Sequence, residues 1–203
     1  IDFPVPRGKV ADWGDKYGNR VDRYNSGIAY LDGVHPTALY GRGYYTRLTW
    51  SAIDVQNGKL VKRWVFDSNN EKSAYANGNH NVMVADVDND GKQEVFTGAA
   101  CIDDNGKLLW ANGKKHGDAM HLGDLDPSRE GMEAWVCHEE THGMSLLDAK
   151  TGKILFHIDA DGDTGRCAGD NVWSGNKGAE LWGAANGNMY NVGGKQIGSK
   201  RPA

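Results

Sequence analysis

One acidic motif constrains the fold of this chain more than any other feature. In the segment 86–94, three aspartates alternate with other residues, a glycine follows them, and a glutamate closes the run. This spacing places three carboxylates on one side of a tight loop, in which Gly91 permits the sharp turn. Ca²⁺ is a hard cation that prefers a cage of oxygen ligands, so the motif predicts a calcium site. The predicted ligands are Asp86, Asp88, Asp90, the carbonyl of Lys92, and Glu94. A solvated acidic turn is the alternative.

The residues that follow indicate the kind of loop. Glu94 comes three residues after Gly91, too early for a helix-loop-helix calcium hand. The next residues, 95–97, favour a strand. We therefore expect a calcium loop between two strands.

The motif recurs along the chain. The segment 124–133 repeats it with one extra residue, 170–180 is a decayed copy, and 12–22 is a divergent one. The copies start 74, 38 and 46 residues apart, and 74 is close to twice 37. A period near forty residues indicates a repeat architecture. These copies add further predicted metal ligands, namely Asp12, Asp15, Asn19, Asp22, Asp124, Asp126 and Glu133.

Each period contains short apolar runs separated by hairpin turns such as Asn105-Gly106 and Thr151-Gly152. With the run that precedes each acidic loop, four strands fit into one period, which is typical of a β-propeller blade. The predicted fold is therefore all-β, without helices. We expect residues 1–203 to form one partial β-propeller domain of roughly four blades, the first of them irregular. The chain either closes as a small ring or is a fragment of a larger one, and we favour the fragment.

Composition narrows the classes of function that this chain can have. The net charge of −4 argues against nucleic-acid binding, which leaves a basic footprint. No apolar run is long enough to span a bilayer, so we expect no membrane contact. The chain begins at Ile1 with neither a methionine nor a signal peptide, which indicates a mature or excised piece. The three cysteines, Cys101, Cys137 and Cys167, lack Cys-x-x-Cys spacing and are expected to pack in the core.

Polar residues also recur where the predicted blades begin. His80 and His116 are 36 residues apart, almost one blade, so we expect them to be neighbours near the propeller axis. With Asp118, His121 and Glu139 they suggest a second, mixed metal site. Imidazole is an uncommon calcium ligand, so the residues alone leave a transition metal open. The alternative is that these residues tie adjacent blades together by hydrogen bonds.

Arg166 stands at the matching position of the next blade. Its guanidinium could bind an anionic substrate with two parallel hydrogen bonds. Alternatively, it pairs on the surface with Asp161 or Asp163. The sequence contains no Gly-x-Ser-x-Gly nucleophile signature and no glycine loop for phosphate. A pair of carboxylates that catalyses glycoside hydrolysis is a further alternative.

Several stretches in a fixed order resemble the rhamnogalacturonan lyases of polysaccharide lyase family 11. They are residues 12–23, 29–34, 42–47, 63–68, 78–81, 116–121 and 123–127. The resemblance implies a secreted or extracellular bacterial enzyme with an eight-bladed propeller, of which this chain would be the middle part. It also implies calcium-dependent β-elimination in the rhamnose–galacturonate backbone of pectic rhamnogalacturonan I. We expect a monomer when full length.

The resemblance further implies roles for single residues. His80, His116, Asp118 and Glu139 match a family calcium site, and Arg166 matches a substrate-contacting arginine. Elimination removes the C5 proton of galacturonate and expels the O4 group, so a general base is required. Lys114, Lys115 and His121 are candidates by position, or the base lies outside the chain. Two alternatives remain: a non-catalytic calcium-binding propeller for carbohydrate binding or adhesion, and a fragment that neither binds nor cleaves.

Overall fold

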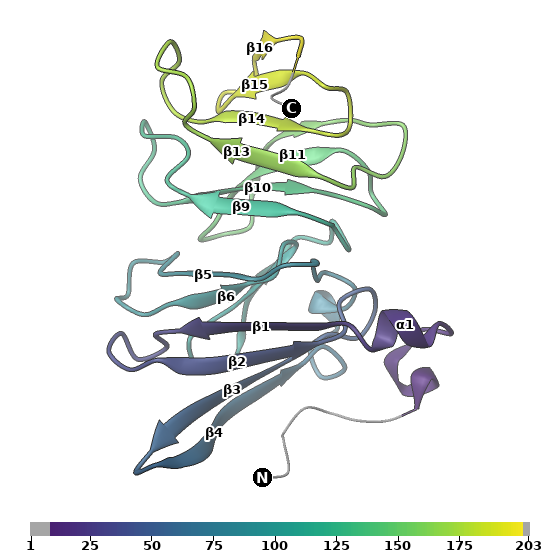
Figure 1. The fold of residues 1–203 in the computed structure, drawn as a ribbon, viewed down its shortest axis with the longest axis vertical. Helices are drawn as coiled ribbons and strands as arrows, with labels where there is room; N and C mark the ends of the chain where they lie inside the picture. Colours follow the sequence, from purple (N-terminus) through teal and green to yellow (C-terminus); the bar gives the residue numbers. More distant parts are fainter. Residues whose placement is uncertain (1–8, 201–203) are drawn as a thin grey trace. The chain divides into compact units, whose positions relative to one another are not determined.

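The computed structural model describes residues 9–200, which form four four-stranded antiparallel sheets (Figure 1). In each sheet, strands consecutive in sequence pair with one another. The first sheet contains β1 (Tyr24–Ala29), β2 (Thr37–Arg42), β3 (Thr49–Gln56) and β4 (Lys59–Asp67). The second contains β5 (Met83–Ala85), β6 (Glu94–Phe96), β7 (Ala100–Ile102) and β8 (Leu108–Ala111). The third contains β9 (Met120–Gly123), β10 (Glu133–Cys137), β11 (Met144–Asp148) and β12 (Ile154–Ile158). The fourth contains β13 (Cys167–Asp170), β14 (Glu180–Gly183), β15 (Met189–Asn191) and β16 (Gln196–Gly198). The prediction of an all-β fold is confirmed.

The chain folds into two compact units, residues 1–116 and 117–203, each with two of the sheets. In the first unit, Leu39 and Trp50 of the first sheet share an apolar core with Val95 and Ile102 of the second. In the second unit, the core joins Trp135 and Leu146 of the third sheet to Leu181 of the fourth. Burial of these side chains against the neighbouring sheet supplies the main driving force for folding within each unit.

Within residues 9–200, three one-turn helices contradict the prediction that the chain contains no helix. They are η1 (Val10–Trp13), α1 (Gly18–Val21) and η2 (Lys72–Ala74). In the first of them, the side chain of Trp13 is 1% exposed, which anchors η1 to the protein. Such short helices carry no apolar periodicity, so a pattern search does not detect them.

The first two helices overlap the segment 12–22, so its backbone differs from that of loop 86–94. Calcium binding by this segment stays a prediction. Asp12 accepts a hydrogen bond from the backbone N–H of Lys9, at 2.8 Å, and Asp15 accepts one from Tyr17, also at 2.8 Å. Asp22 forms an ion pair with Arg42 at 2.7 Å. Asn19 accepts hydrogen bonds from the Arg23 guanidinium. The three aspartates, Asp12, Asp15 and Asp22, belong to none of the metal-type clusters found among residues 9–200.

None of the helices in residues 9–200 combines the length and the hydrophobicity needed to cross a bilayer.

Candidate metal sites

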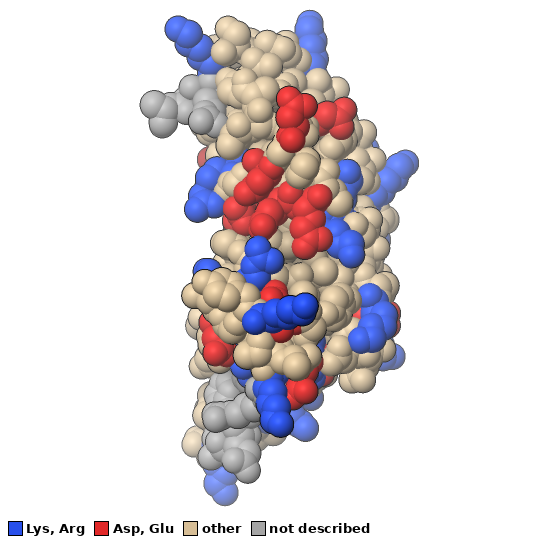
Figure 2. All heavy atoms as spheres, turned by 90° about the vertical axis from the view of Figure 1, so that its right-hand side faces the viewer, with Lys and Arg blue, Asp and Glu red and all other residues tan. Residues whose placement is uncertain are grey.

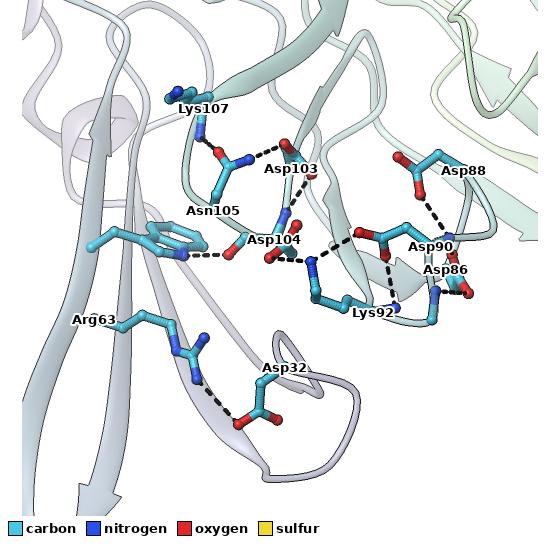
Figure 3. A network of polar contacts seen from close by, with 12 residues as sticks. Asp32, Arg63, Asp86, Asp88, Asp90, Lys92, Asp103, Asp104, Asn105 and Lys107 are labelled. Atoms are coloured by element: carbon cyan, nitrogen blue, oxygen red, sulfur yellow. Dashed lines mark hydrogen bonds and ion pairs between the residues drawn. The ribbon is translucent and has the colours of Figure 1, made fainter.

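The loop 86–94 connects β5 to β6 and folds around its own carboxylates (Figure 3). Asp86 accepts hydrogen bonds from the backbone N–H groups of Asp90 and Gly91, at 3.1 and 2.9 Å. The chain turns sharply there because Asn89 and Gly91 adopt φ values of +66° and +89°. As a result, one oxygen from each of Asp86, Asp88 and Asp90 lies within 4.8 Å of the others. The three carboxylates therefore converge as the spacing predicted.

Glu94 supplies the strongest indication that this loop needs a cation. Its side chain is fully buried, and its Oε2 accepts a hydrogen bond from the Val87 N–H at 2.7 Å. Its Oε1 is buried and has no hydrogen-bond partner within the described chain, residues 9–200. Burial, followed by repulsion from the nearby aspartates, raises the pKa of Glu94 to about 8. A buried carboxylate oxygen without a donor is costly, so the site favours a cation beside it.

Asp104 joins this cluster from the turn between β7 and β8, and sequence reasoning missed it. Oxygens of Asp90, Glu94 and Asp104 lie within 4.8 Å of one another. The ammonium of Lys92 bridges Asp90 at 3.0 Å and Asp104 at 3.3 Å (Figure 3). Burial raises the pKa of Asp104, whereas the hydrogen bond from Lys92 lowers the pKa of Asp90. The prediction that the Lys92 carbonyl binds the ion stays a prediction.

The first sheet holds the loop in place through the connection between β1 and β2. The N–H of Tyr30 donates to the side-chain oxygen of Gln93 at 2.9 Å, and the Gln93 N–H donates back to Tyr30 at 3.2 Å. Gly33 approaches so closely that a Cβ there would lie 2.5 Å from the carbonyl oxygen of Gly91. The loop is therefore fixed by contacts from outside its own sheet.

In the third sheet, the glutamate at the position of Glu94 is paired with a positively charged side chain of the protein. Glu133 begins β10 as Glu94 begins β6, and it accepts a hydrogen bond from the Asp126 N–H at 2.9 Å. Its other oxygen accepts one from Nε of Arg129 at 3.2 Å, and Arg129 also pairs with Asp148 at 3.0 Å. Within residues 9–200, Asp124, Asp126 and Glu133 form no metal-type cluster. Calcium binding by this loop stays a prediction.

The equivalent glutamate of the fourth sheet is satisfied by neutral donors. Oε2 of Glu180 accepts from the N–H groups of Val172 and Trp173, at 2.9 and 2.8 Å. Its Oε1 accepts from the side-chain amide of Asn176 at 2.9 Å. Of the three equivalent glutamates, Glu94 alone keeps a buried oxygen with no donor in residues 9–200. Loop 86–94 is therefore the best candidate for a bound ion.

The predicted proximity of His80 and His116 is confirmed in the first unit. Their ring centroids lie 4.9 Å apart, and His116 is fully buried. Nδ1 of His116 lies 2.8 Å from the carbonyl oxygen of Gly78. A carbonyl only accepts, so Nδ1 carries the proton and Nε2 carries the lone pair that a metal needs. Burial lowers the pKa of His116 to about 3, which keeps the ring neutral.

Two tyrosines and an arginine surround the histidine pair, and sequence reasoning assigned no role to them. The Tyr45 hydroxyl lies 2.9 Å from Nε2 of His80. The ring of Tyr44 stacks on His116 at 5.3 Å and 8°. The guanidinium of Arg20 lies 4.5 Å from the centre of the Tyr45 ring. If Nε2 of His80 donates to Tyr45, then Nδ1 of His80 also presents a lone pair.

Asp118, Glu139 and Arg166 belong to the second unit, where Nη1 of Arg166 lies 3.5 Å from Asp118. Asp161 and Asp163, the predicted alternative partners of Arg166, are exposed. Acidic side chains gather in one region of the face shown in Figure 2. That Asp118 and Glu139 share an ion with the histidines, and that Arg166 binds substrate, stay predictions.

Two other groups in the second unit have side chains that could act in catalysis, as a general base or as a nucleophile. Nε2 of His121 lies 3.2 Å from the carbonyl oxygen of Cys167, so that nitrogen carries a proton and cannot accept one in this conformation. Ser145 contacts a histidine on each side, with Oγ 2.9 Å from His138 and 2.8 Å from His157. Ser145 is fully buried, so this arrangement cannot serve as an accessible nucleophile.

Comparison with known proteins decides the family. The model of rhamnogalacturonan lyase family 11, C-terminal domain, matches residues 1–203. The chain belongs to rhamnogalacturonan lyase family 11. Its family 11 relatives include the rhamnogalacturonan exolyase YesX of Bacillus subtilis, which is 50% identical over 90% of this chain. They also include the rhamnogalacturonan endolyase YesW of the same organism, which is 46% identical over 99% of the chain.

The solved family 11 structures share the fold. The crystal structure of YesX gives a TM-score of 0.93 at 45% identity over 98% of this chain, and that of YesW gives 0.94 at 44% over 99%. The Bacillus licheniformis rhamnogalacturonan lyase gives 0.93 at 46% over 98%. The chain spans 31% of YesX and 33% of YesW, so it covers about a third of these relatives. The matching family model describes the C-terminal domain, and the central position of this chain within the catalytic propeller stays a prediction.

Proposed function

We propose that this chain is part of a rhamnogalacturonan lyase that cleaves the rhamnose–galacturonate backbone of pectic rhamnogalacturonan I by calcium-assisted β-elimination. Membership of family 11 and the names of the relatives support the reaction class. The observation that carries the calcium requirement is the buried Oε1 of Glu94, which lacks a donor within residues 9–200 and adjoins three converging aspartates. We also propose that the full-length protein is secreted, since a polymeric substrate cannot enter a cell, and that it is monomeric.

The four sheets are, in this proposal, blades of a propeller completed by sheets outside this chain. Consecutive four-stranded meanders are the repeating unit of such a fold, which supports the proposal. The first sheet also leaves apolar side chains exposed: Tyr24 and Ile28 on β1 are 62% and 63% exposed, and Tyr40 on β2 is 39% exposed. Tyr40 lies opposite Ser26 in the strand register, so these side chains share one face. A further sheet packed there would bury them.

A calcium ion in loop 86–94 would be held by Asp86, Asp88, Asp90 and Glu94, with the Lys92 carbonyl as the predicted fifth group. Its charge would neutralise the buried carboxylate of Glu94. Because contacts from Tyr30 and Gly33 fix this loop, we assign it a structural role: it joins the first sheet to the second.

The histidine pair is the centre that we assign to the chemistry. A calcium ion bound there would neutralise the uronate carboxylate and so acidify the C5 proton. His116 contributes a neutral ring whose Nε2 lone pair is fixed by the Gly78 carbonyl. Tyr45 fixes the orientation of His80. Arg166 would bind the uronate carboxylate, and Asp118 and Glu139 are the predicted additional ligands. We assign no general base.

The test uses the full-length protein and purified rhamnogalacturonan I, with formation of the unsaturated sugar product followed by its ultraviolet absorbance. We expect activity to disappear on chelation and to return with Ca²⁺. The His116→Gln variant should lose activity while still binding Ca²⁺ in loop 86–94. Product formation that survives thorough chelation would contradict the calcium mechanism. Pectin binding without product formation by the wild type would instead support a non-catalytic binding module.

A further inference from the structure

Two of the three cysteines lie side by side in the second unit. Cys137 ends β10 and Cys167 begins β13, so they belong to different sheets. Both thiols donate to the same acceptor, the carbonyl oxygen of Ala119, at 3.5 Å from Cys137 and 3.4 Å from Cys167. Cα atoms of β10 and β13 approach within 8 Å. The third cysteine, Cys101, is buried in β7 of the first unit.

The two thiols differ in acidity. The neighbouring Cys167 thiol lowers the pKa of Cys137, whereas burial raises the pKa of Cys167. Such an asymmetric pair contains one thiol that ionises more readily than its neighbour, and both lie against the same carbonyl oxygen, which is an arrangement that suits dithiol oxidation. Neither thiol takes part in the proposed lyase chemistry.

We propose that Cys137 and Cys167 are a redox-convertible pair, which an oxidant of the small-molecule disulfide class joins into a bond between the third and fourth sheets. One cysteine thiolate attacks a sulfur of the oxidant and releases its first thiol. The other cysteine, as a thiolate, attacks the resulting mixed disulfide and releases the second thiol. The pair loses two electrons and two protons, and the oxidant gains them as two thiols.

The bond would close a loop between positions 137 and 167 and tie together two sheets that otherwise meet through side-chain packing. Cys137 is fully buried and Cys167 is 8% exposed, so the oxidant reaches the pair when the two sheets part transiently. The conversion is therefore slow in the folded protein and is independent of the proposed function.

The experiment treats the purified native protein with mixtures of oxidised and reduced glutathione, blocks free thiols and digests with trypsin. Cleavage after lysine and arginine separates the cysteines into peptides 93–107, 130–150 and 167–177. We expect peptides 130–150 and 167–177 to be linked, in proportion to the oxidised fraction of glutathione. Reduction with dithiothreitol should release both.

Cys101→Ser is the matched control, because it removes a buried thiol that belongs to the other unit. This variant should keep the linked peptide, whereas Cys137→Ser and Cys167→Ser should lose it. Recovery of peptides 130–150 and 167–177 singly from the oxidised wild type would overturn the proposal, whether they carry blocked thiols or glutathione. A link from either peptide to 93–107 would overturn it as well.

Discussion

The substitution Glu94→Gln should stabilise the calcium-free protein, which is the reverse of what the loss of a buried hydrogen-bonded side chain usually does. In the ion-free state, the pKa of Glu94 is raised from 4.5 to about 8, mainly by burial. The folded protein therefore holds a proton that the unfolded chain gives up between these values. Its free energy of unfolding falls as the pH rises through this window.

The magnitude follows from the same two values. At about 1.4 kcal/mol for each tenfold change in acidity, the full effect is about 5 kcal/mol, and about 2 kcal/mol is reached by about pH 6. Glutamine has no charge to bury, and its amide oxygen can keep the hydrogen bond from the Val87 N–H. The variant should therefore match the wild type near about pH 4 and exceed it by about 5 kcal/mol at about pH 9.

Calcium should remove much of this difference. An ion at about one hundred times its dissociation constant stabilises the wild type by about 2.7 kcal/mol, and the variant, with its ligand lost, gains little. The assay is urea unfolding across this pH range, in chelator and in excess Ca²⁺. Parallel pH profiles for the two proteins in chelator would refute the reasoning.

The matched control is Glu180→Gln, because both oxygens of Glu180 have donors. Glutamine there places an amide N–H₂ against a donor, either the Asn176 amide or the loop N–H groups. This change should destabilise the protein by about 1–3 kcal/mol, with or without Ca²⁺. In chelator, the two substitutions should thus change the free energy of unfolding in opposite directions. Changes in the same direction would show that Glu94 carries no unbalanced buried charge.

Three further outcomes can be checked. Tyr45→Phe removes the hydroxyl beside His80 and should lower lyase activity about 10–100-fold, with partial rescue by excess Ca²⁺. The control, Tyr44→Phe, keeps the ring stacked on His116 and should have a smaller effect in the same product assay. The pKa of His116 is lowered from 6.5 to about 3, so the ion-free protein should lose stability as the pH falls through this window, by up to about 5 kcal/mol, and His116→Gln should flatten that part of the urea-derived profile. Gly33→Ala should weaken Ca²⁺ binding measured by calorimetry, because the added Cβ would meet the carbonyl oxygen of Gly91. The control is Gly58→Ala, since Gly58 has a similar positive φ but no neighbour within 4 Å of an added Cβ. This control should cost about 1 kcal/mol of stability and leave Ca²⁺ binding unchanged.

Local spacing predicted what local geometry controls. The alternation of Asp86, Asp88 and Asp90 brings their oxygens together because the turn residues between them fix the backbone within a few positions. In the segment 12–22, acidic residues make local hydrogen bonds and an ion pair beside one-turn helices and the buried Trp13, and calcium binding there stays a prediction. An acid that follows a turn can cap backbone N–H groups as readily as it can bind an ion, and the motif alone does not separate these roles.

Contacts between distant segments lay beyond the sequence pattern. Asp104 reaches the acidic loop from a hairpin turn. Its Asp-Asn-Gly sequence is typical of such turns, so nothing in the sequence pointed to a second role for the aspartate. Tyr45 and His80 are 35 residues apart, about one repeat, but an aromatic residue before β3 and an imidazole before β5 are different residue types, so no shared motif pointed to their contact. The histidine pair was predictable because its spacing matched the repeat. The residues that orient the pair share no motif with it, so their contacts were found only in the fold.

The three equivalent glutamates show how the same position acquires different chemistry. Glu94, Glu133 and Glu180 each begin the second strand of a sheet, and each accepts a backbone N–H from the loop before it. Their second oxygens differ: Arg129 donates to Glu133, Asn176 donates to Glu180, and Oε1 of Glu94 has no donor in residues 9–200. The backbone bond is a property of the fold, so it persists in all three of these repeats. The remaining charge is balanced by whichever residue the loop contains, and only a loop without such a residue leaves that charge for a metal ion.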